Sequence, residues 1–143
     1  MPKRSIKGRN PWKGGTVKIL VIDDDPDLIA LCRINLAIDG HEVVEATNGW
    51  EGLELLALCE PDVVLLDVMM PTLDGLEVLR IIRDEEATHD LPVVIVSARV
   101  GLEDQIAGRD AGADGYITKP FTPDQLVHAL ELALRSRRIP ERK

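Results

Sequence analysis

The stretch Lys-Ile-Leu-Val-Ile at 18–22, followed by Asp-Asp-Asp-Pro at 23–26, decides the fold. An almost wholly apolar run of this length is typical of a strand whose two faces are both covered. Asp25 is a favoured N-cap residue and Pro26 suits the first helical position, so we expect a helix to begin there. A buried strand that leads straight into a helix predicts an α/β architecture.

The same alternation continues along the rest of the chain. We expect strands at Val17–Ile22, Glu42–Glu45, Asp62–Leu66, Pro92–Val96 and Gly115–Ile117. Helices are expected after the N-cap residues Asp25, Asn48, Asp74 and Thr122, with a further helix near Leu102–Arg109. Five βα units joined by right-handed crossovers require a parallel sheet with helices on both faces.

Apolar spacing predicts which helix residues are buried. The expected buried positions are Leu28, Leu31, Cys32, Leu36, Leu53, Leu56, Ala57, Leu76, Leu79, Ile82, Leu126, Ala129, Leu130 and Ala133. The helix near 102–109 has only Leu102 and Ile106 as an apolar stripe, which is consistent with weak packing and easy repositioning.

Length and composition indicate one domain with an aliphatic core. The chain has 143 residues, of which 45% are hydrophobic and only 3% aromatic. No apolar run approaches the roughly 20 residues of a membrane span, and the first residues lack a signal peptide's apolar stretch, so we expect no membrane partner. We interpret Cys32 and Cys59 as reduced, buried thiols of a cytoplasmic protein, and the histidines at 41, 89 and 128 as surface or boundary residues.

Charge divides the chain into three parts. Residues 1–16 carry five bases and no acid and are interpreted as a disordered basic tail, and residues 136–143 as a basic tail or the start of a linker. The domain is expected at 17–135, and residues 17–134 hold 7 bases against 24 acids. Because this excess of negative charge repels the phosphate backbone of nucleic acids, we expect no direct nucleic-acid binding by this domain.

Three aspartates are expected to meet at one edge of the sheet. Asp23 and Asp24 follow the first strand, and Asp67 follows the third. Ligands of such folds bind at the carboxyl ends of the strands. Close carboxylates repel one another unless a cation compensates, and Mg²⁺ is the natural candidate because it prefers oxygen ligands.

Two further residues extend this cluster. Ser97 follows the fourth strand and Lys119 follows the fifth, so a hydroxyl and an ammonium would join the carboxylates. A carboxylate nucleophile, a metal ion and a fixed cation are what phosphoryl transfer to an aspartate requires.

Between Val17 and Arg135 the chain resembles the receiver domain of two-component response regulators. The motifs that carry the resemblance are Ile-Leu-Val-Ile-Asp-Asp-Asp (19–25), Leu-Leu-Asp-Val-Met-Met-Pro (65–71) with Asp74-Gly75, Val-Ser-Ala (96–98) and Ala-Gly-Ala-Asp-Gly-Tyr-Ile-Thr-Lys-Pro-Phe (111–121). The resemblance implies a (βα)₅ flavodoxin-like receiver fold, with a five-stranded parallel sheet in the order 2-1-3-4-5.

The resemblance also implies roles for individual residues. Asp67 would accept a phosphoryl group from a histidine kinase or a histidine phosphotransfer protein. Asp24 would bind Mg²⁺ directly and Asp23 chiefly through water, with Asp67 and the backbone carbonyl of Met69 as further ligands.

The resemblance implies further roles for residues that bind the phosphoryl group or that change conformation when the domain is phosphorylated. Ser97 would bond a phosphoryl oxygen, Lys119 would pair with it, and the Lys119–Pro120 peptide bond is expected to be cis. Tyr116 would turn inward when Ser97 moves. We also hypothesise that apolar Met69 and bulky Arg99 slow hydrolysis of the phosphorylated form.

The resemblance implies a signalling phosphoacceptor, which catalyses its own phosphorylation and dephosphorylation, rather than a conventional enzyme. A homodimer could form through the face made by the fourth helix, the fifth strand and the fifth helix. A stand-alone regulator and the receiver of a longer protein are both compatible with the residues after 135.

Three alternative functions fit parts of the sequence. A haloacid-dehalogenase-type phosphatase would use Asp23 and Asp25 as its Asp-x-Asp pair, but Asp27 replaces the usual Thr or Val. A flavodoxin-like cofactor binder would need a phosphate loop where the three aspartates stand. A degenerate receiver would keep the fold and lack the chemistry.

Overall fold

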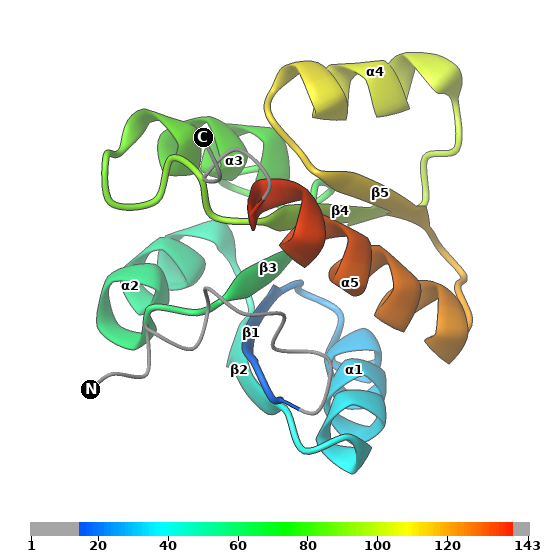
Figure 1. The fold of residues 1–143 in the computed structure, drawn as a ribbon. Helices are drawn as coiled ribbons and strands as arrows, with labels where there is room; N and C mark the ends of the chain where they lie inside the picture. The colour runs from blue at the N-terminus through cyan, green and yellow to red at the C-terminus, as the bar shows by residue number, and fades with distance from the viewer. Residues whose placement is uncertain (1–14, 139–143) are drawn as a thin grey trace.

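The computed structural model describes residues 15–138, so most of the two tails predicted at 1–16 and 136–143 lies outside the described residues. Strands and helices alternate along the chain, as expected (Figure 1). They are β1 (Lys18–Ile22), α1 (Pro26–Ile38), β2 (Glu42–Ala46), α2 (Gly49–Cys59), β3 (Val63–Asp67), α3 (Gly75–Asp84), β4 (Val93–Ser97), α4 (Leu102–Asp110), β5 (Gly115–Thr118) and α5 (Pro123–Arg138).

The five strands form one parallel sheet in the order β2-β1-β3-β4-β5, which confirms the predicted topology. β3 and β4 each end one residue later than predicted, because Asp67 pairs with Val96 and Ser97 pairs with Thr118 in the sheet. Both polar residues are therefore the last residues of rigid strands.

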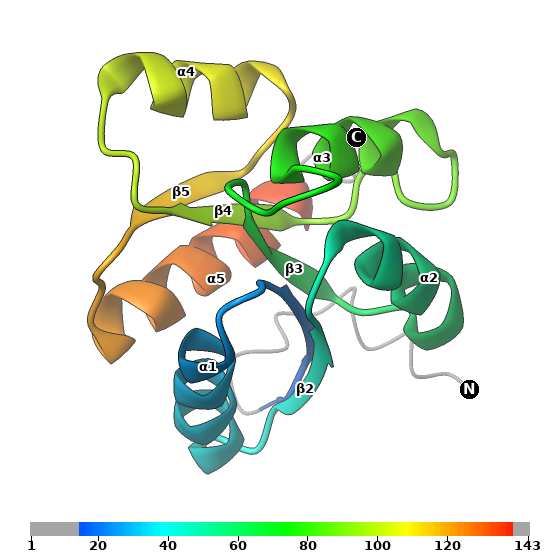
Figure 2. The same ribbon diagram turned by 180° about the vertical axis from the view of Figure 1, so that it is seen from behind.

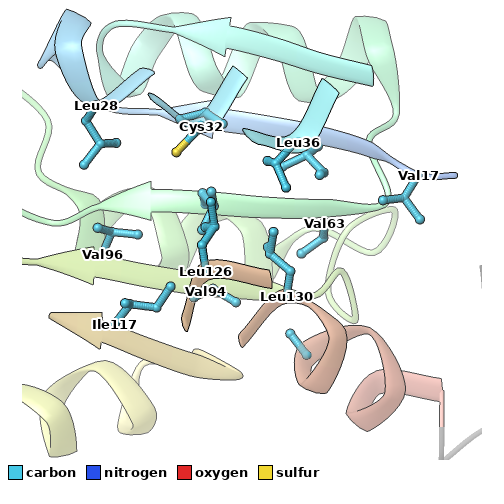
Figure 3. Close-up of a cluster of buried hydrophobic side chains, with 14 of the residues drawn as sticks. Val17, Leu28, Cys32, Leu36, Val63, Val94, Val96, Ile117, Leu126 and Leu130 are labelled. Atoms are coloured by element: carbon cyan, nitrogen blue, oxygen red, sulfur yellow. The ribbon is translucent and has the colours of Figure 1, made fainter. Parts of the chain in front are cut away.

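The helices cover both faces of the sheet. Figures 1 and 2 show α1 and α5 on one face and α2, α3 and α4 on the other. Between α1, α5 and the sheet lies a core that includes Cys32, Leu36, Leu126 and Leu130 (Figure 3). Val21 faces this core and its neighbour Ile22 faces the other, as the two-residue period of a strand requires.

The predicted helix starts are confirmed by their capping bonds. The side chain of Asp25 accepts from the N–H of Asp27, and that of Asn48 accepts from the N–H of Glu51. Asp74 and Glu77 form a reciprocal capping box, and so do Thr122 and Gln125. Each cap holds a helix start beside the carboxyl edge of the sheet.

Several burial predictions were wrong. Leu31 is 41% exposed and Ala57 is exposed, because the buried face of each helix is narrower than its apolar stripe. Leu53, Leu76 and Ala129 were also predicted to be buried, and they are half-buried.

The predicted stripe of α4 is also exposed, at 72% for Leu102 and 45% for Ile106. The buried residue of this helix is Gly108, where an added Cβ would lie 2.8 Å from the Cδ1 of Ile95. α4 therefore packs by close backbone approach rather than through large apolar side chains.

Two further residues differ from expectation. His41 is buried rather than at the surface, and its Nδ1 accepts a hydrogen bond from the N–H of Val17 at 3.1 Å. Cys32 and Cys59 are both free thiols, but only Cys32 is buried.

α5 extends through Arg138, three residues beyond the predicted domain boundary. Among residues 15–138, no helix combines the length and the apolar character needed to cross a bilayer.

Candidate functional site

The sheet order brings three aspartates together at the carboxyl edge. β1 and β3 are neighbours, with Ile22 paired to Leu66, so Asp23 and Asp67 are the next residues along two adjacent parallel strands. Asp24 follows directly. Each of Asp23, Asp24 and Asp67 offers a carboxylate oxygen, and these three oxygens lie within 4.8 Å of one another. The predicted convergence of the three side chains is therefore present.

Hydrogen bonds to the backbone orient the two buried carboxylates. Oδ1 of Asp23 accepts from the N–H of Asp25 at 2.9 Å, and Oδ1 of Asp67 accepts from the N–H of Met69 at 3.0 Å. Asp23 and Asp67 are 1% and 4% exposed, whereas Asp24 is exposed. The cluster thus has a fixed inner part and one carboxylate that reaches solvent.

Lys119 reaches the same cluster from the end of β5. Its Nζ lies 3.2 Å from Oδ2 of Asp23 and 3.7 Å from Oδ2 of Asp67. Its own N–H donates to the carbonyl of Ser97 at 2.9 Å, which holds the loop after β5 against the end of β4. The Lys119–Pro120 bond is cis, as predicted.

Charge in the cluster is only partly balanced. Desolvation by burial raises the pKa of Asp23 to about 6. The hydrogen bond from the Asp25 N–H lowers this pKa, the charge of Asp67 raises it, and Lys119 lowers it again. Burial lowers the pKa of Lys119, but Asp23 and Asp67 outweigh it, with help from Asp25, so the net direction is upward. The ammonium is therefore held charged, while the carboxylates still repel one another.

Hydrogen bonds through Arg99 connect Ser97 to Tyr116. Ser97 is fully buried and its Oγ accepts from the N–H of Arg99 at 3.0 Å. The hydroxyl of Tyr116 donates to the carbonyl of the same residue, Arg99, at 3.0 Å. The segment after β4 thus links the predicted phosphoryl-binding serine to the predicted switch tyrosine.

A groove of about 510 Å³ lies between the β3–α3 loop and α4. Met69 and Met70 from the β3–α3 loop line one part of it, and Arg99, Ala107 and Tyr116 line another. The side chain of Met69 is 48% exposed.

Gly75 has a role at the site that its sequence position alone does not reveal. A Cβ on this residue would lie 2.3 Å from the carbonyl oxygen of Asp67 and 2.5 Å from the Cα of Val68. Glycine therefore lets the start of α3 pack directly against the end of β3. Asp74-Gly75 indicates a helix start, but nothing local indicates this long-range contact.

The arrangement can accept an electrophile on a carboxylate and compensate the charge of its oxygens. Asp67 is held by one hydrogen bond, one ammonium lies nearby, and a serine hydroxyl lies at the end of the neighbouring strand. Of the three acids, Asp24 is the one exposed to solvent, which suits it to contact a hydrated cation.

Comparison with known proteins agrees with this geometry. The family model described as response regulator receiver domain matches residues 19–131. The chain belongs to the response regulator receiver domain family. Receiver domains are phosphorylated by a kinase and bind Mg²⁺ at an acidic pocket, which is the general function of the family.

Curated relatives show how much of a regulator the receiver chain spans. It is 40% identical over 125 residues to the DNA-binding dual master transcriptional regulator RpaA of Synechocystis, covering 87% of this chain and 52% of that protein. It is 44% identical over 119 residues to the response regulator MprA of Mycolicibacterium vanbaalenii, covering 83% of this chain and 51% of that protein. The chain thus spans about half the length of these relatives.

Solved structures support the receiver fold. A putative response regulator from Chloroflexus aurantiacus superposes with a TM-score of 0.80 at 32% identity, covering 84% of this chain and 98% of that one. The chemotaxis protein CheY4 of Vibrio cholerae gives 0.77 at 28% identity, covering 82% and 98%.

The geometry also bears on the phosphatase alternative. A phosphatase of that type would use Asp23 and Asp25 together on its substrate. The carboxylate of Asp25 instead caps α1 by accepting from the N–H of Asp27 at 3.0 Å. The residue that joins Asp23 in the carboxylate cluster is instead Asp67, from β3.

Proposed function

We propose that Asp67 is the phosphoacceptor of this receiver domain and that a phosphohistidine of a kinase or phosphotransfer protein is its donor. A carboxylate oxygen of Asp67 attacks phosphorus, a P–O bond forms, and the P–N bond to the donor imidazole breaks. The imidazole keeps the electron pair and takes up a proton. The observation that carries the proposal is the convergence of three carboxylates, one ammonium and one serine at a single edge.

The donor set fits Mg²⁺. Asp23, Asp24 and Asp67 present oxygen ligands within 4.8 Å of one another, and Lys119 is the one base in contact with them among the described residues. Burial raises the pKa of Asp23 to about 6, and a bound cation would favour the charged form of this carboxyl group. These residues would hold the ion, and by the resemblance the carbonyl of Met69 would add a ligand. A bound Mg²⁺ would neutralise charge on the phosphoryl oxygens.

Lys119 and Ser97 would bind the transferred group. The Nζ of Lys119 already lies 3.7 Å from Asp67 and could pair with a phosphoryl oxygen added there. Ser97 accepts a hydrogen bond from Arg99, which leaves its O–H able to donate to another phosphoryl oxygen. Because these residues serve the transfer themselves, the domain would catalyse its own phosphorylation from small-molecule donors and its own dephosphorylation.

Phosphorylation would act through a shift between two conformations. A move of Ser97 toward the phosphoryl group would disturb its bond with Arg99 and, through the Arg99 carbonyl, the bond to Tyr116. Tyr116 borders the 510 Å³ groove, which gives its ring space to turn inward. The face formed by α4, β5 and α5 would then bind a second copy or a downstream partner, in the cytoplasm.

The test is phosphorylation of the full chain by acetyl phosphate, followed by intact-mass spectrometry. We expect one added phosphoryl group in the presence of Mg²⁺ and none after chelation with EDTA. Asp67→Asn should remain unmodified, whereas Asp84→Asn, an exposed acid at the end of α3, serves as the matched control and should behave as wild type. Equal labelling of Asp67→Asn and wild type would contradict the proposal.

A further inference from the structure

A second groove lies at the amino edge of the sheet, opposite the carboxylate cluster. Its volume is about 660 Å³, and it lies between α2 and α3. Its walls are largely apolar and include Leu53 and Leu56 from α2, Ile81 from α3, and Leu91 from the segment before β4. A recess of this kind favours a ligand with at least one large apolar side chain.

The groove is also electronegative. Glu60 and Glu85 line it, and they are the C-cap residues of α2 and α3. The C-terminal ends of the two helices add partial negative charge from their dipoles. This end of α2 already accepts one ammonium, since the Nζ of Lys18 donates to the carbonyl of Cys59 at 2.8 Å. The preferred occupant is therefore basic as well as apolar.

The chain itself carries a segment of that composition. Residues 1–14 contain five bases and no acid, together with Ile6 and Trp12. The described chain enters β1 next to the end of α2, because the N–H of Lys18 donates to Oδ2 of Asp62 at 2.8 Å.

The connection is long enough for this segment to reach the groove. The start of β4 is two strands from β1, which is about 10 Å at the usual spacing. Trp12 is six residues before Lys18, the first residue of β1, and six extended residues span about 20 Å. Tethering gives such a segment an effective concentration of about 1 mM or more, so weak contacts suffice for occupancy.

We propose that the groove between α2 and α3 binds residues 1–14 of the same chain, with Trp12 against its apolar walls and basic side chains near Glu60 and Glu85. This surface lies away from Asp67 and would serve as an intramolecular docking site. A tryptophan can bury 150–250 Å² of surface, which makes Trp12 the main apolar contributor.

The test uses the full chain with Trp50→Phe, so that Trp12 is the only remaining tryptophan. Trp50 is 59% exposed, so its replacement should be tolerated. Acrylamide quenching and the emission maximum then report the exposure of Trp12. We expect Trp12 to be protected in the folded chain relative to the same chain in urea, and the protection to weaken in 1 M salt.

Charge reversal then tests the groove as the site of protection. Glu60→Lys with Glu85→Lys should lower the ratio of docked to undocked segment by about tenfold, as two surface charge pairs of ordinary strength would. Glu103→Lys with Asp110→Lys makes the same change of charge at exposed positions of α4 and should keep the protection. Ala57→Lys changes an exposed groove position of α2 and should reduce the protection of Trp12 even when Glu60 and Glu85 are both kept.

Three results would overturn the proposal. Trp12 could be as accessible in the folded chain as in urea, or it could keep its protection in both groove variants. Protection that depends on protein concentration would instead assign the groove to the segment of a second copy.

Discussion

Lys119 and Asp23 form the main ion pair of the site. Their 3.2 Å pair is largely buried, and Asp67 adds a second carboxylate 3.7 Å from the same ammonium. Two buried acids facing one base leave a charge deficit that burial makes costly. A bound cation would therefore compensate charge on the same residues that would perform phosphoryl transfer.

Met69 should control the lifetime of the phosphorylated form. Its side chain is 48% exposed and its backbone N–H donates to the Asp67 carboxylate, so we expect the side chain to hinder an attacking water. Met69→Asn should shorten the lifetime of the acyl phosphate by about fivefold, equivalent to about 1 kcal/mol of barrier. The rate can be followed by loss of the phosphorylated mass after donor removal.

A control separates this effect from a general change in polarity. Leu102→Asn replaces an exposed apolar residue of α4 and should leave the lifetime as in wild type. The guanidinium of Arg99 pairs with Asp104 at 3.4 Å, so we expect Arg99 to shield the phosphoryl group less than Met69 does. Unchanged hydrolysis in Met69→Asn would remove the shielding role.

At the scale of elements, the junction of β3 and α3 depends on Gly75. Gly75→Ala would place a methyl group 2.3 Å from the Asp67 carbonyl, so the start of α3 must move. We expect a loss of about 1–3 kcal/mol in the free energy of unfolding, as for other overpacked sites, together with a lower phosphorylation yield. Urea unfolding measures the first and intact mass the second.

Gly115→Ala is the matched substitution in β5. Its Cβ would meet no atom closer than 3.5 Å, so its free energy of unfolding should stay within about 0.5 kcal/mol of wild type. If the two alanine variants proved equally stable, close packing at Gly75 would be refuted.

The junction of α1, β1 and β2 should respond to pH through His41. Burial lowers the pKa of His41 below its ordinary 6.5, although the carboxylates of Asp39 and Glu131 act in the opposite direction. Its Nδ1 also accepts the Val17 N–H, which requires the neutral ring. Below about pH 6.5 the unfolded chain therefore binds a proton that the native chain resists, and stability falls as the pH decreases.

His41→Gln should remove this pH dependence. The free energy of unfolding, measured in urea from about pH 7.5 to 5, should fall more steeply in wild type than in the variant, and above pH 7 the difference should be constant. Parallel curves over the whole range would show that His41 titrates alike in both states.

The sequence made the strands and the aspartate cluster predictable for physical reasons. Apolar runs such as Val63–Leu66 indicate strands covered on both faces, and the parallel order then places Asp23 and Asp67 at one edge. Capping residues such as Asp25 and Asn48 form bonds within three residues, so their pattern is readable locally.

Other features depend on contacts between distant segments and were not predictable. The packing of Gly75 on β3 and of Gly108 on Ile95 is set by how closely helices approach the sheet. The burial of His41 depends on the Val17 N–H, which lies 24 residues away. Leu31 has the spacing of a core residue, but α5 and the sheet leave its side of α1 exposed.

At the scale of the whole molecule, cation binding should stabilise the fold. A ligand that binds only the native state adds about 2.7 kcal/mol at a concentration one hundred times its Kd. Mg²⁺ should therefore raise the melting temperature of wild type relative to EDTA. Asp24→Asn should lose most of this increase, whereas Asp110→Asn, an exposed acid on α4, should retain it.

Two results of this melting experiment would contradict cation binding by the aspartate cluster. An identical melting temperature in Mg²⁺ and EDTA, or a full Mg²⁺ effect in Asp24→Asn, would place the cation elsewhere.

The location of the acyl phosphate tests the central claim most directly. Chain phosphorylated in the presence of Mg²⁺ can be reduced with borohydride, which converts an acyl phosphate to an alcohol and so marks the modified residue for peptide mass spectrometry. We predict that the mark is on Asp67 alone, at the end of β3 and within reach of Lys119. A mark on Asp23, Asp24 or any other acid would contradict the account.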